Sequence, residues 1–536
     1  MRSRSLALPV AVLVGAAVTA QASGVATAHP ERAAQPSQTA APRTDIVAPL
    51  PLGAPGLSQS QSEQSLAPGV TLTTVVRGQA SRADTWVLRS LQATKAAADD
   101  LATRIRLNGY PAGVQRIDAR AADDPVTGPL GWLVVSAGYP TEAAAKQAQA
   151  ALAVGGITGL GVSNTALYSR NATGPWVVRI LTVRRQHLAQ VHARLATDIV
   201  PGKETTSSVA QRLGALAATN GGYFVVGTAD GVPGDPAGVA VQDGRYDSEP
   251  VADRAALVLQ RKGARAERVT SSMQLTAPDG ATTSLGGTDR AVGVIRDCGG
   301  PGDIPTVRPQ QDVTCTNANE IVTFDRSFGT TADTGPGVAV TLDSRQRVLA
   351  VAPQRGGAIP YRGQVIEGIG AGADWLTAHA HRGEVLTVAS ALLADGHRLR
   401  LTSSTGIVNG GPFLVRHGRQ SIDAWQEGFV HPGDPGFYFG FAVSRNPRTM
   451  AGITRAGDLL VVTVDGRAPG YSIGMSFAEQ AGVLRALGAR DALNLDGGGS
   501  TAMVVRGELL GRPSDTTGER PVGDVLAVLP QQRAGS

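Results

Sequence analysis

The chain has 536 residues, of which 42% are hydrophobic and 17% charged, enough for roughly two or three domains with well-buried cores. Its 49 Lys and Arg against 44 Asp and Glu give a net charge of +5, too small and too scattered to indicate a nucleic-acid-binding protein. Beyond the N-terminal region, no stretch approaches the roughly 20 apolar residues that a membrane-spanning helix needs.

The first 28 residues have the pattern of a secretory signal peptide. Arg2 and Arg4 form a basic start, and the apolar segment 6–20 is too short for a stable spanning helix. The step Ala26-Thr27-Ala28 offers a small-x-small cleavage site. We therefore predict that residues 1–28 are removed and that the protein is secreted or associated with the cell wall. An uncleaved membrane anchor is the alternative.

Two segments of different composition follow the signal peptide. Residues 29–67 are rich in Ala, Pro, Ser and Gln, which predicts a disordered linker. Residues 68–170 contain a weak internal repeat, in which "TWVLRSLQATKAAADDLATRIRLNGYPAGVQRI" and "GWLVVSAGYPTEAAAKQAQAALAVGGITGLGVS" share one plan. Each half has the pattern of a strand, a helix, a turn and a strand. Trp132 in the second half occupies the position equivalent to Trp86 in the first. Two such β-α-β halves predict a small ferredoxin-like sandwich.

This N-terminal pattern resembles SPOR domains, which are envelope modules that bind peptidoglycan. The resemblance rests on shape and spacing over about residues 70 to 168, and it implies peptidoglycan as a partner. A generic α+β packing domain is the alternative.

From residue 173 to about 530 the chain consists mainly of short strand-like runs separated by glycine-rich turns. The clearest helix is "SFAEQAGVLRALGA", in which Phe477, Ala481 and Leu484 fall on one face and Gly488 stands as a C-terminal cap. The overall prediction is therefore an α+β protein. A small ferredoxin-like module at its N-terminus precedes a larger β-rich α+β domain.

The chain has two cysteines, Cys298 and Cys315, in a segment rich in Gly, Pro and Asn. In an exported protein this pattern predicts a disulfide that closes a short loop. Two cysteines alone make a poor zinc site, and a catalytic thiol is disfavoured.

Three glycine corners have the same design. "NGGYFV" lies at residues 220–225, "NGGPFLV" at 409–415 and "NLDGGGSTAMVV" at 494–505. Paired glycines permit positive φ and a close approach of the backbone to a ligand. One such corner alone predicts a tight hairpin, whereas three of them suggest convergence on one site whose amides face an anion or sugar hydroxyls.

Several side chains near the last corner suit an anionic ligand. Arg448 and Arg467 carry planar guanidinium groups that match phosphate oxygens, although each could equally form a surface salt bridge. Glu479 is ambiguous, because Ser476 and Glu479 also fit the capping box that closes the first turn of a helix.

Two other catalytic patterns are rejected. "GYSIG" matches a nucleophile elbow, but the last histidine, His431, precedes Ser472, whereas that fold needs a later one. His379 and His381 lack a third ligand at a convincing spacing. The sequence requires no cofactor. It leaves open whether a divalent cation binds near the acidic cluster.

The run "PRTMAGIT…VVTVDGR…GMSFAEQAGVLRALGARDALNLDGGGSTAMVV…RPSDTTGERPVGDVLAV", with "AATNGGYF" upstream, resembles the phosphodiester glycosidase family. That family includes the lysosomal enzyme that removes N-acetylglucosamine from a sugar-1-phosphodiester. The resemblance spans roughly residues 175 to 530. It implies that three carboxylates are catalytic: Asp496, Glu479 and Asp465. The substrate and phosphate ligands that it implies are Asn220, Arg448, Thr449, Arg467, Gly497, Gly498, Gly499, Ser500, Ser514, Asp515 and Arg520. One position departs from the usual bacterial pattern, since Gly511 replaces an Asn before RPSD.

The resemblance implies hydrolysis of the bond between an anomeric carbon and a phosphodiester oxygen. Asp496 and Glu479 are the candidates to attack that carbon or to activate water, and Asp465 is expected to orient Arg467. The arginines would neutralise the departing phosphate. The alternatives are a non-catalytic envelope protein that binds peptidoglycan and glycan phosphates, or a glycan-phosphate transferase in exopolysaccharide assembly.

Overall fold

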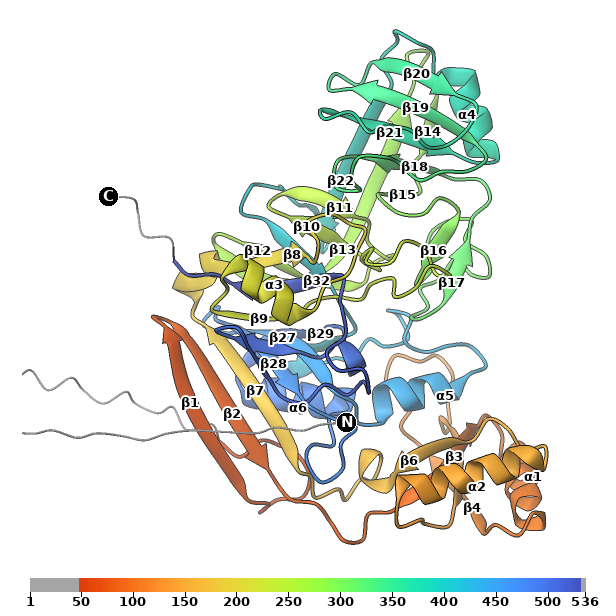
Figure 1. Ribbon diagram of the computed structural model, residues 1–536, viewed down its shortest axis with the longest axis vertical. Coiled ribbons are helices and arrows are strands. Elements are labelled where there is room, and N and C mark those ends of the chain that lie inside the picture. The colour runs from red at the N-terminus through yellow and green to blue at the C-terminus, as the bar shows by residue number, and fades with distance from the viewer. Residues whose placement is uncertain (1–47, 532–536) are drawn as a thin grey trace, which may run out of the picture. The chain divides into compact units, whose positions relative to one another are not determined.

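The computed structural model describes residues 48–531. The chain is a β-rich α+β protein with several antiparallel sheets, as predicted (Figure 1). Its central element is an eight-stranded sheet. In spatial order the strands are β1 (Gln59–Ala67), β2 (Val70–Arg77), β7 (Trp176–Val183), β28 (Leu459–Val464), β27 (Arg448–Thr454), β29 (Ala489–Asn494), β25 (Phe413–Arg416) and β26 (Arg419–Gln420).

The middle strands of this sheet are buried on both faces, which explains their continuous apolar sequences. Along β28, Leu459 and Val461 pack in one hydrophobic core, whereas Leu460 and Val462 pack in another on the opposite face. This alternation follows from the two-residue period of a strand. Helix α6 (Phe477–Ala486) packs against the second of these cores.

The predicted linker is wrong for its last part. Residues 59–67 form strand β1, which pairs with β2, and β2 in turn pairs with β7 of the central sheet. Only Leu66 of β1 is fully buried, so the strand is a polar sheet edge whose composition resembles that of a disordered segment. Strand β2 belongs to the central sheet as well, although the predicted N-terminal domain included it. The predicted signal peptide and residues 29–47 lie outside the described residues.

The N-terminal module has the element order β-α-β-β-α-β of a ferredoxin-like sandwich. Its antiparallel sheet has the order β4-β5-β3-β6. The bounds are β3 (Trp86–Gln92), α1 (Lys95–Leu107), β4 (Ala112–Ile117), β5 (Gly131–Ser136), α2 (Glu142–Val154) and β6 (Gly161–Asn164). A short 3-10 helix, η1 (Thr165–Leu167), follows.

Both faces of the module's sheet are covered. Along β5, Trp132 and Val134 pack with the two helices, whereas Leu133 and Val135 pack in the core shared with the larger domain. Tyr438 and Phe439 belong to that same shared core. The face opposite the helices is therefore packed against the larger domain along β5, and peptidoglycan binding by the module stays a prediction.

The remaining strands form four further sheets (Figure 1). A second large sheet contains β11 (Arg245–Ser248), β10 (Ala240–Gln242), β24 (Gly406–Asn409), β12 (Ala255–Gln260), β13 (Gly263–Thr276), β22 (Thr387–Ala394) and β23 (His397–Arg398), with β14 (Thr282–Ser284) paired to β13. A five-stranded sheet beyond β13 and β22 contains β15 (Gly287–Thr288), β18 (Ile321–Phe324), β21 (Gly363–Gly368), β19 (Val338–Asp343) and β20 (Val348–Ala352), next to helix α4 (Ala371–His379). The C-terminal sheet contains β31 (Glu508–Leu510), β30 (Met503–Val505), β9 (Ala217–Asn220), β32 (Asp524–Val528) and β8 (Val191–Leu195), with helix α3 (Thr206–Leu213).

Two small strands, β16 (Val294–Arg296) and β17 (Thr314–Thr316), pair with each other and hold the predicted disulfide between Cys298 and Cys315. The disulfide is confirmed. Within residues 48–531, no helix has the length and apolar character needed to span a membrane.

Candidate active site

A cavity of about 410 Å³ opens beside the last glycine corner. Its walls come from segments that are far apart in the sequence. They are the first glycine corner, the disulfide loop, the segment before β27, the loops after β28 and β29, and the C-terminal loop. The lining residues are Tyr223, Phe224, Val226, Ala237, Arg296, Asp297, Gln311, Asp312, Gly436, Phe437, Gly440, Phe441, Asn446, Arg448, Arg467, Asp496, Gly497, Gly498, Gly499 and Arg520.

The three glycine corners converge, but they do so mainly by binding one another. Asn220 Nδ2 donates to the carbonyl of Asp496 (2.7 Å), and Tyr223 N donates to Asn409 Oδ1 (2.8 Å). Tyr223 Oη donates to the carbonyl of Gly411 (2.8 Å). Of the glycines in these corners, only those after Asp496 line the cavity. The first two corners therefore position the third one.

The glycines after Asp496 are needed where they stand. Gly498 has φ +58°, a left-handed conformation that favours glycine. A Cβ atom on Gly499 would lie 2.2 Å from Arg520 Nη2 and 2.3 Å from Asp515 Oδ1, so a side chain there would displace the Arg520–Asp515 pair. The Gly497 amide donates to Asp496 Oδ1 (2.8 Å) and fixes the carboxylate at the start of this turn.

The carboxylate of Asp496 belongs to the cavity wall and is largely shielded from solvent. It forms no ion pair within the described part of the chain, although four arginines line the same cavity. Burial raises the pKa of Asp496 to about 7, while the Gly497 amide and the positive charge of Arg520 oppose this rise. A shift of this kind marks a residue suited to acid–base or nucleophilic chemistry near neutral pH.

Arg448 is a buried cation that lacks an acidic partner. Its side chain is 3% exposed, lies over the rings of Phe441 and Phe477, and donates to the carbonyls of Met475 (3.1 Å) and Phe441. It forms no ion pair within residues 48–531. Burial lowers the pKa of Arg448 to about 9, so the guanidinium stays charged at neutral pH. A charge held in this way favours an anionic ligand.

Two further arginines of the cavity, Arg467 and Arg520, differ in their partners. Arg467 is exposed, and its Nε donates to Asn446 Oδ1 (3.0 Å) without an ion pair to any described residue. Arg520 is held by both oxygens of Asp515, at 2.8 and 3.1 Å. Asp515 therefore positions Arg520 and does not itself line the cavity.

Four further predicted ligands lie outside the cavity lining. Asn220 and Thr449 are buried, and Thr449 Oγ1 donates to Asn220 Oδ1 (2.6 Å), so this pair holds the Asp496 turn from behind. Ser500 is 1% exposed within the short helix η4 (Gly498–Ser500). Ser514 lies in the C-terminal loop near Asp515. Substrate contact by these four side chains is not supported, and the first two act on the site through the backbone of Asp496.

Glu479 is not among the residues that line the cavity, and its contacts do not support the predicted catalytic role. Ser476 N donates to Glu479 Oε2 (2.9 Å), and the reciprocal bond completes a capping box at the start of α6. Both carboxylate oxygens also accept hydrogen bonds from Arg445, the shortest at 2.7 Å. Arg445 in turn donates to the carbonyls of Ala166 and Ser169 in the segment after the module. Glu479 is therefore structural.

Replacing Glu479 with alanine is expected to destabilise the fold with little effect on chemistry. The change removes the capping box and leaves the buried Arg445 without its acidic partner, a loss of about 3 kcal/mol or more. The melting temperature should fall by several degrees, while kcat/KM below the transition stays within about threefold, as for a change outside the reacting groups. A large loss of kcat/KM in a folded variant would contradict this assignment.

Asp465 is also engaged elsewhere. It pairs with Arg179 (3.0 Å) and accepts a hydrogen bond from Tyr471 Oη (2.6 Å), so the prediction that it orients Arg467 is wrong. Gly511 packs against this pair, and a Cβ atom there would lie 2.6 Å from Asp465 Oδ1. The departure of Gly511 from the family pattern therefore leaves room for the Asp465–Arg179 ion pair.

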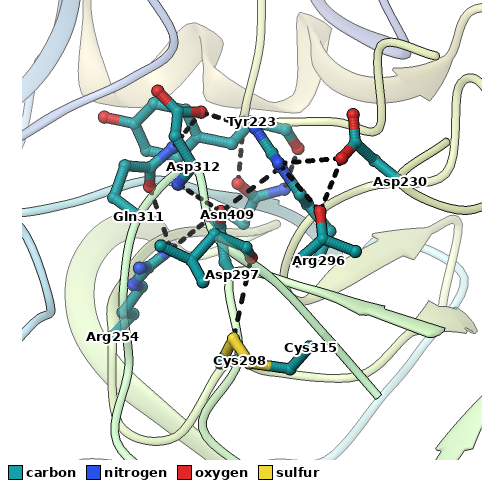
Figure 2. A network of polar contacts seen from close by, with 12 residues as sticks. Tyr223, Asp230, Arg254, Arg296, Asp297, Cys298, Gln311, Asp312, Cys315 and Asn409 are labelled. Atoms are coloured by element: carbon teal, nitrogen blue, oxygen red, sulfur yellow. Dashed lines mark hydrogen bonds and ion pairs between the residues drawn. A yellow bond between two sulfur atoms is a disulfide. The ribbon is translucent and has the colours of Figure 1, made fainter. Parts of the chain in front are cut away.

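Two parts of the cavity were not predicted from the sequence. Phe437 and Phe441 belong to helix α5 (Pro435–Tyr438) and the π-helix η3 (Phe439–Val443), and their rings stack at 5.4 Å. The segment 437–441 has four aromatic residues in five in a chain that is only 4% aromatic, a signal that was available. The disulfide loop contributes Arg296, Gln311 and Asp312 (Figure 2).

The family model for phosphodiester glycosidase matches residues 336–529. A protein of Burkholderia pseudomallei named "Putative exported protein" has a crystal structure that matches with a TM-score of 0.81 and 35% identity, covering 90% of this chain and 98% of that one. This chain belongs to the phosphodiester glycosidase family. The family match contains Arg448, Arg467 and Asp496, whereas Tyr223 and Asp312 lie before it.

Two more solved structures resemble this phosphodiester glycosidase family member. A hypothetical protein from Synechocystis shares the fold, with a TM-score of 0.52 and 18% identity over 88% of this chain and 79% of that one. The zebrafish N-acetylglucosamine-1-phosphodiester alpha-N-acetylglucosaminidase catalytic domain, auto-inhibited by its pro-peptide, matches with a TM-score of 0.34 and 16% identity over 67% of this chain and 78% of that one. No curated protein matches the chain.

Proposed function

We propose that this protein is an exported hydrolase that cleaves the glycosidic bond of a sugar-1-phosphodiester and releases the sugar and a phosphomonoester. The observation that carries the proposal is that a carboxylate and cations, none of them in an ion pair with another described residue, line one cavity. Asp496 faces it without an ion pair, and so do the cations Arg448 and Arg467. A substrate with an anionic phosphodiester beside an electron-poor anomeric carbon matches this arrangement.

The cavity residues divide between the two ends of such a substrate. Arg448 and Arg467, with Arg520, bind the phosphate oxygens and take up the charge that develops as the phosphomonoester leaves. Asp496 lies beside the anomeric carbon and stabilises the positive charge that develops there. Phe437 and Phe441 contribute apolar surface to the cavity wall, against which the sugar packs. Phosphate is already a good leaving group, so strong acid help at its oxygen is not needed.

Export is supported by the disulfide, which is typical of oxidising compartments, and by the name of the Burkholderia relative. Glycan phosphates of the cell envelope are then the natural substrate class. Among residues 48–531, no group of three or more His, Cys, Asp or Glu side chains is placed to hold a metal ion.

The first test measures free sugar from a panel of sugar-1-phosphodiesters, including UDP-N-acetylglucosamine, with the mature protein. Mass spectrometry of the products separates hydrolysis, in which the sugar bears a water oxygen, from transfer to a second glycan. Release of free sugar and phosphomonoester supports the proposal. Binding of wall fragments without turnover of any substrate would favour a non-catalytic envelope protein instead.

A further inference from the structure

We propose that Asp312, on the loop closed by the disulfide, is the second catalytic carboxylate and takes the proton from the water that attacks the anomeric carbon. The inference rests on the proposed hydrolase function. It assigns a role that the sequence had given to Glu479.

Hydrolysis at an anomeric carbon needs a group that removes a proton from water in addition to the charge-stabilising carboxylate. The nearby acidic residues are otherwise engaged. Glu479 and Asp515 have both oxygens hydrogen-bonded to arginines. Asp465 has one oxygen paired with Arg179 and the other with Tyr471. None of these three lines the cavity.

Two more carboxylates line the cavity with Asp496, namely Asp297 and Asp312. Asp297 is fully buried, and its Oδ2 accepts from Arg254 (2.7 Å) while its Oδ1 accepts from Asp312 N (2.8 Å). Asp297 is therefore occupied in holding the loop, because each of its oxygens already accepts a hydrogen bond and the side chain is buried.

Asp312 differs from Asp297 in having an available oxygen. Its Oδ1 accepts from Arg296 (3.0 Å) and from Gln311 (3.4 Å), and its Oδ2 makes no hydrogen bond to any residue in the range 48–531. The side chain is 47% exposed, so water reaches it. The negative charge of Asp312 also helps to raise the pKa of Asp496, which indicates that the two carboxylates interact across the cavity.

The backbone of Asp312 is held in an uncommon conformation. Its φ is +61°, a left-handed value that is costly for most residues but tolerated by aspartate and asparagine. The Asp312 amide donates to the Asp297 carboxylate, which holds this turn within the loop that the disulfide closes (Figure 2).

The proposed step is balanced. The bond between the water oxygen and the anomeric carbon forms while the bond from that carbon to the phosphate oxygen breaks. The bonding electron pair leaves with the phosphomonoester, whose charge the arginines neutralise. One proton of the water passes to Oδ2 of Asp312 and later returns to solvent.

The chain offers a matched control, because Arg296 pairs with two carboxylates. Asp230 accepts from Arg296 at 3.2 Å and Asp312 at 3.0 Å, but only Asp312 lines the cavity. The test compares Asp312→Asn, Asp312→Gly and Asp230→Asn in the mature protein, without further truncation. Asparagine and glycine both accept the left-handed backbone at this position. Melting temperatures establish that each variant is folded.

We expect both Asp312 variants to lose about 10²- to 10⁴-fold in kcat, the usual contribution of a general base, and Asp230→Asn to keep wild-type activity. Azide attacks without losing a proton, so it should restore cleavage in Asp312→Gly and yield a glycosyl azide. Wild-type activity in Asp312→Asn would overturn the assignment. So would equal losses in the Asp230 and Asp312 variants without azide rescue, which would indicate a structural ion pair. If the wild type cleaves no sugar-1-phosphodiester, the proposed function fails and the assignment falls with it.

Discussion

Replacing Asp496 with asparagine is expected to lower kcat/KM for a sugar-1-phosphodiester by about 10³-fold or more while the protein stays folded. The variant keeps the shape of the side chain but loses the negative charge that stabilises the anomeric carbon in the transition state. Steady-state kinetics with product analysis measures the loss. A folded Asp496→Asn variant that retains most of the wild-type kcat/KM would remove Asp496 from the mechanism.

The same residue predicts a pH dependence with a definite sign. Because the pKa of Asp496 is about 7 and the ionised form acts, kcat/KM should rise as the pH increases through about 7 and then level off. Stability should respond in the opposite direction. A carboxyl whose folded pKa is raised loses stabilising free energy as the pH rises from its unfolded value near 4 toward 7. At pH 8 the Asp496→Asn variant should therefore melt at or above the wild-type temperature, and a fall of several degrees would argue that the loss of activity is structural.

Replacing Arg448 with glutamine is expected to lower kcat/KM by about 10²- to 10³-fold, the size of effect seen when one charge-stabilising donor is removed from an active site. The buried guanidinium has no acidic partner in the described part of the chain, so its charge is available to the phosphate. The variant should also lose the rise in melting temperature that inorganic phosphate or a sugar-1-phosphate gives the wild type. That stabilisation amounts to about 2.7 kcal/mol at a ligand concentration of 100 times Kd.

Two controls sharpen this experiment. Arg448→Lys keeps the charge but not the planar fork, and it should lie between the wild type and Arg448→Gln in activity. Arg485→Gln removes a cation that lies outside the cavity lining, and it should leave both kinetics and phosphate stabilisation unchanged. Full phosphate stabilisation in Arg448→Gln would show that the anion binds elsewhere.

Much of the fold was predictable because the signals are periodic and local. The repeated halves of the module contain two β-α-β units, and the strands around Leu460 have the continuous apolar sequence of a doubly covered sheet. Strand β1 was missed because its residues are polar, and only its pairing with β2 distinguishes it from a disordered segment. Such pairing is not encoded in local composition.

The site was predictable in part. The glycines after Asp496 and the arginines at 448, 467 and 520 stand in a recognisable pattern, and the structure brings them together at one cavity. Glu479 fits the family pattern, but it fits a helix cap equally well. What distinguishes the two roles is its ion pair with Arg445, a residue distant in the sequence. Asp312 had no signal of its own, because its neighbours suggested only a disulfide.

The N-terminal module enters and leaves the central sheet at one point. Strand β2 ends where β7 begins, since Arg77 is paired with Trp176, and the whole module lies between them. It is thus an insertion into a hairpin connection, the kind of site at which a domain can be gained or exchanged without disturbing the register of the strands. Tyr438 and Phe439 would lose their cover if the module were removed, so its exchange is constrained by that apolar surface. Evolution could therefore change what the module contacts while Asp496 and the arginines stay in place.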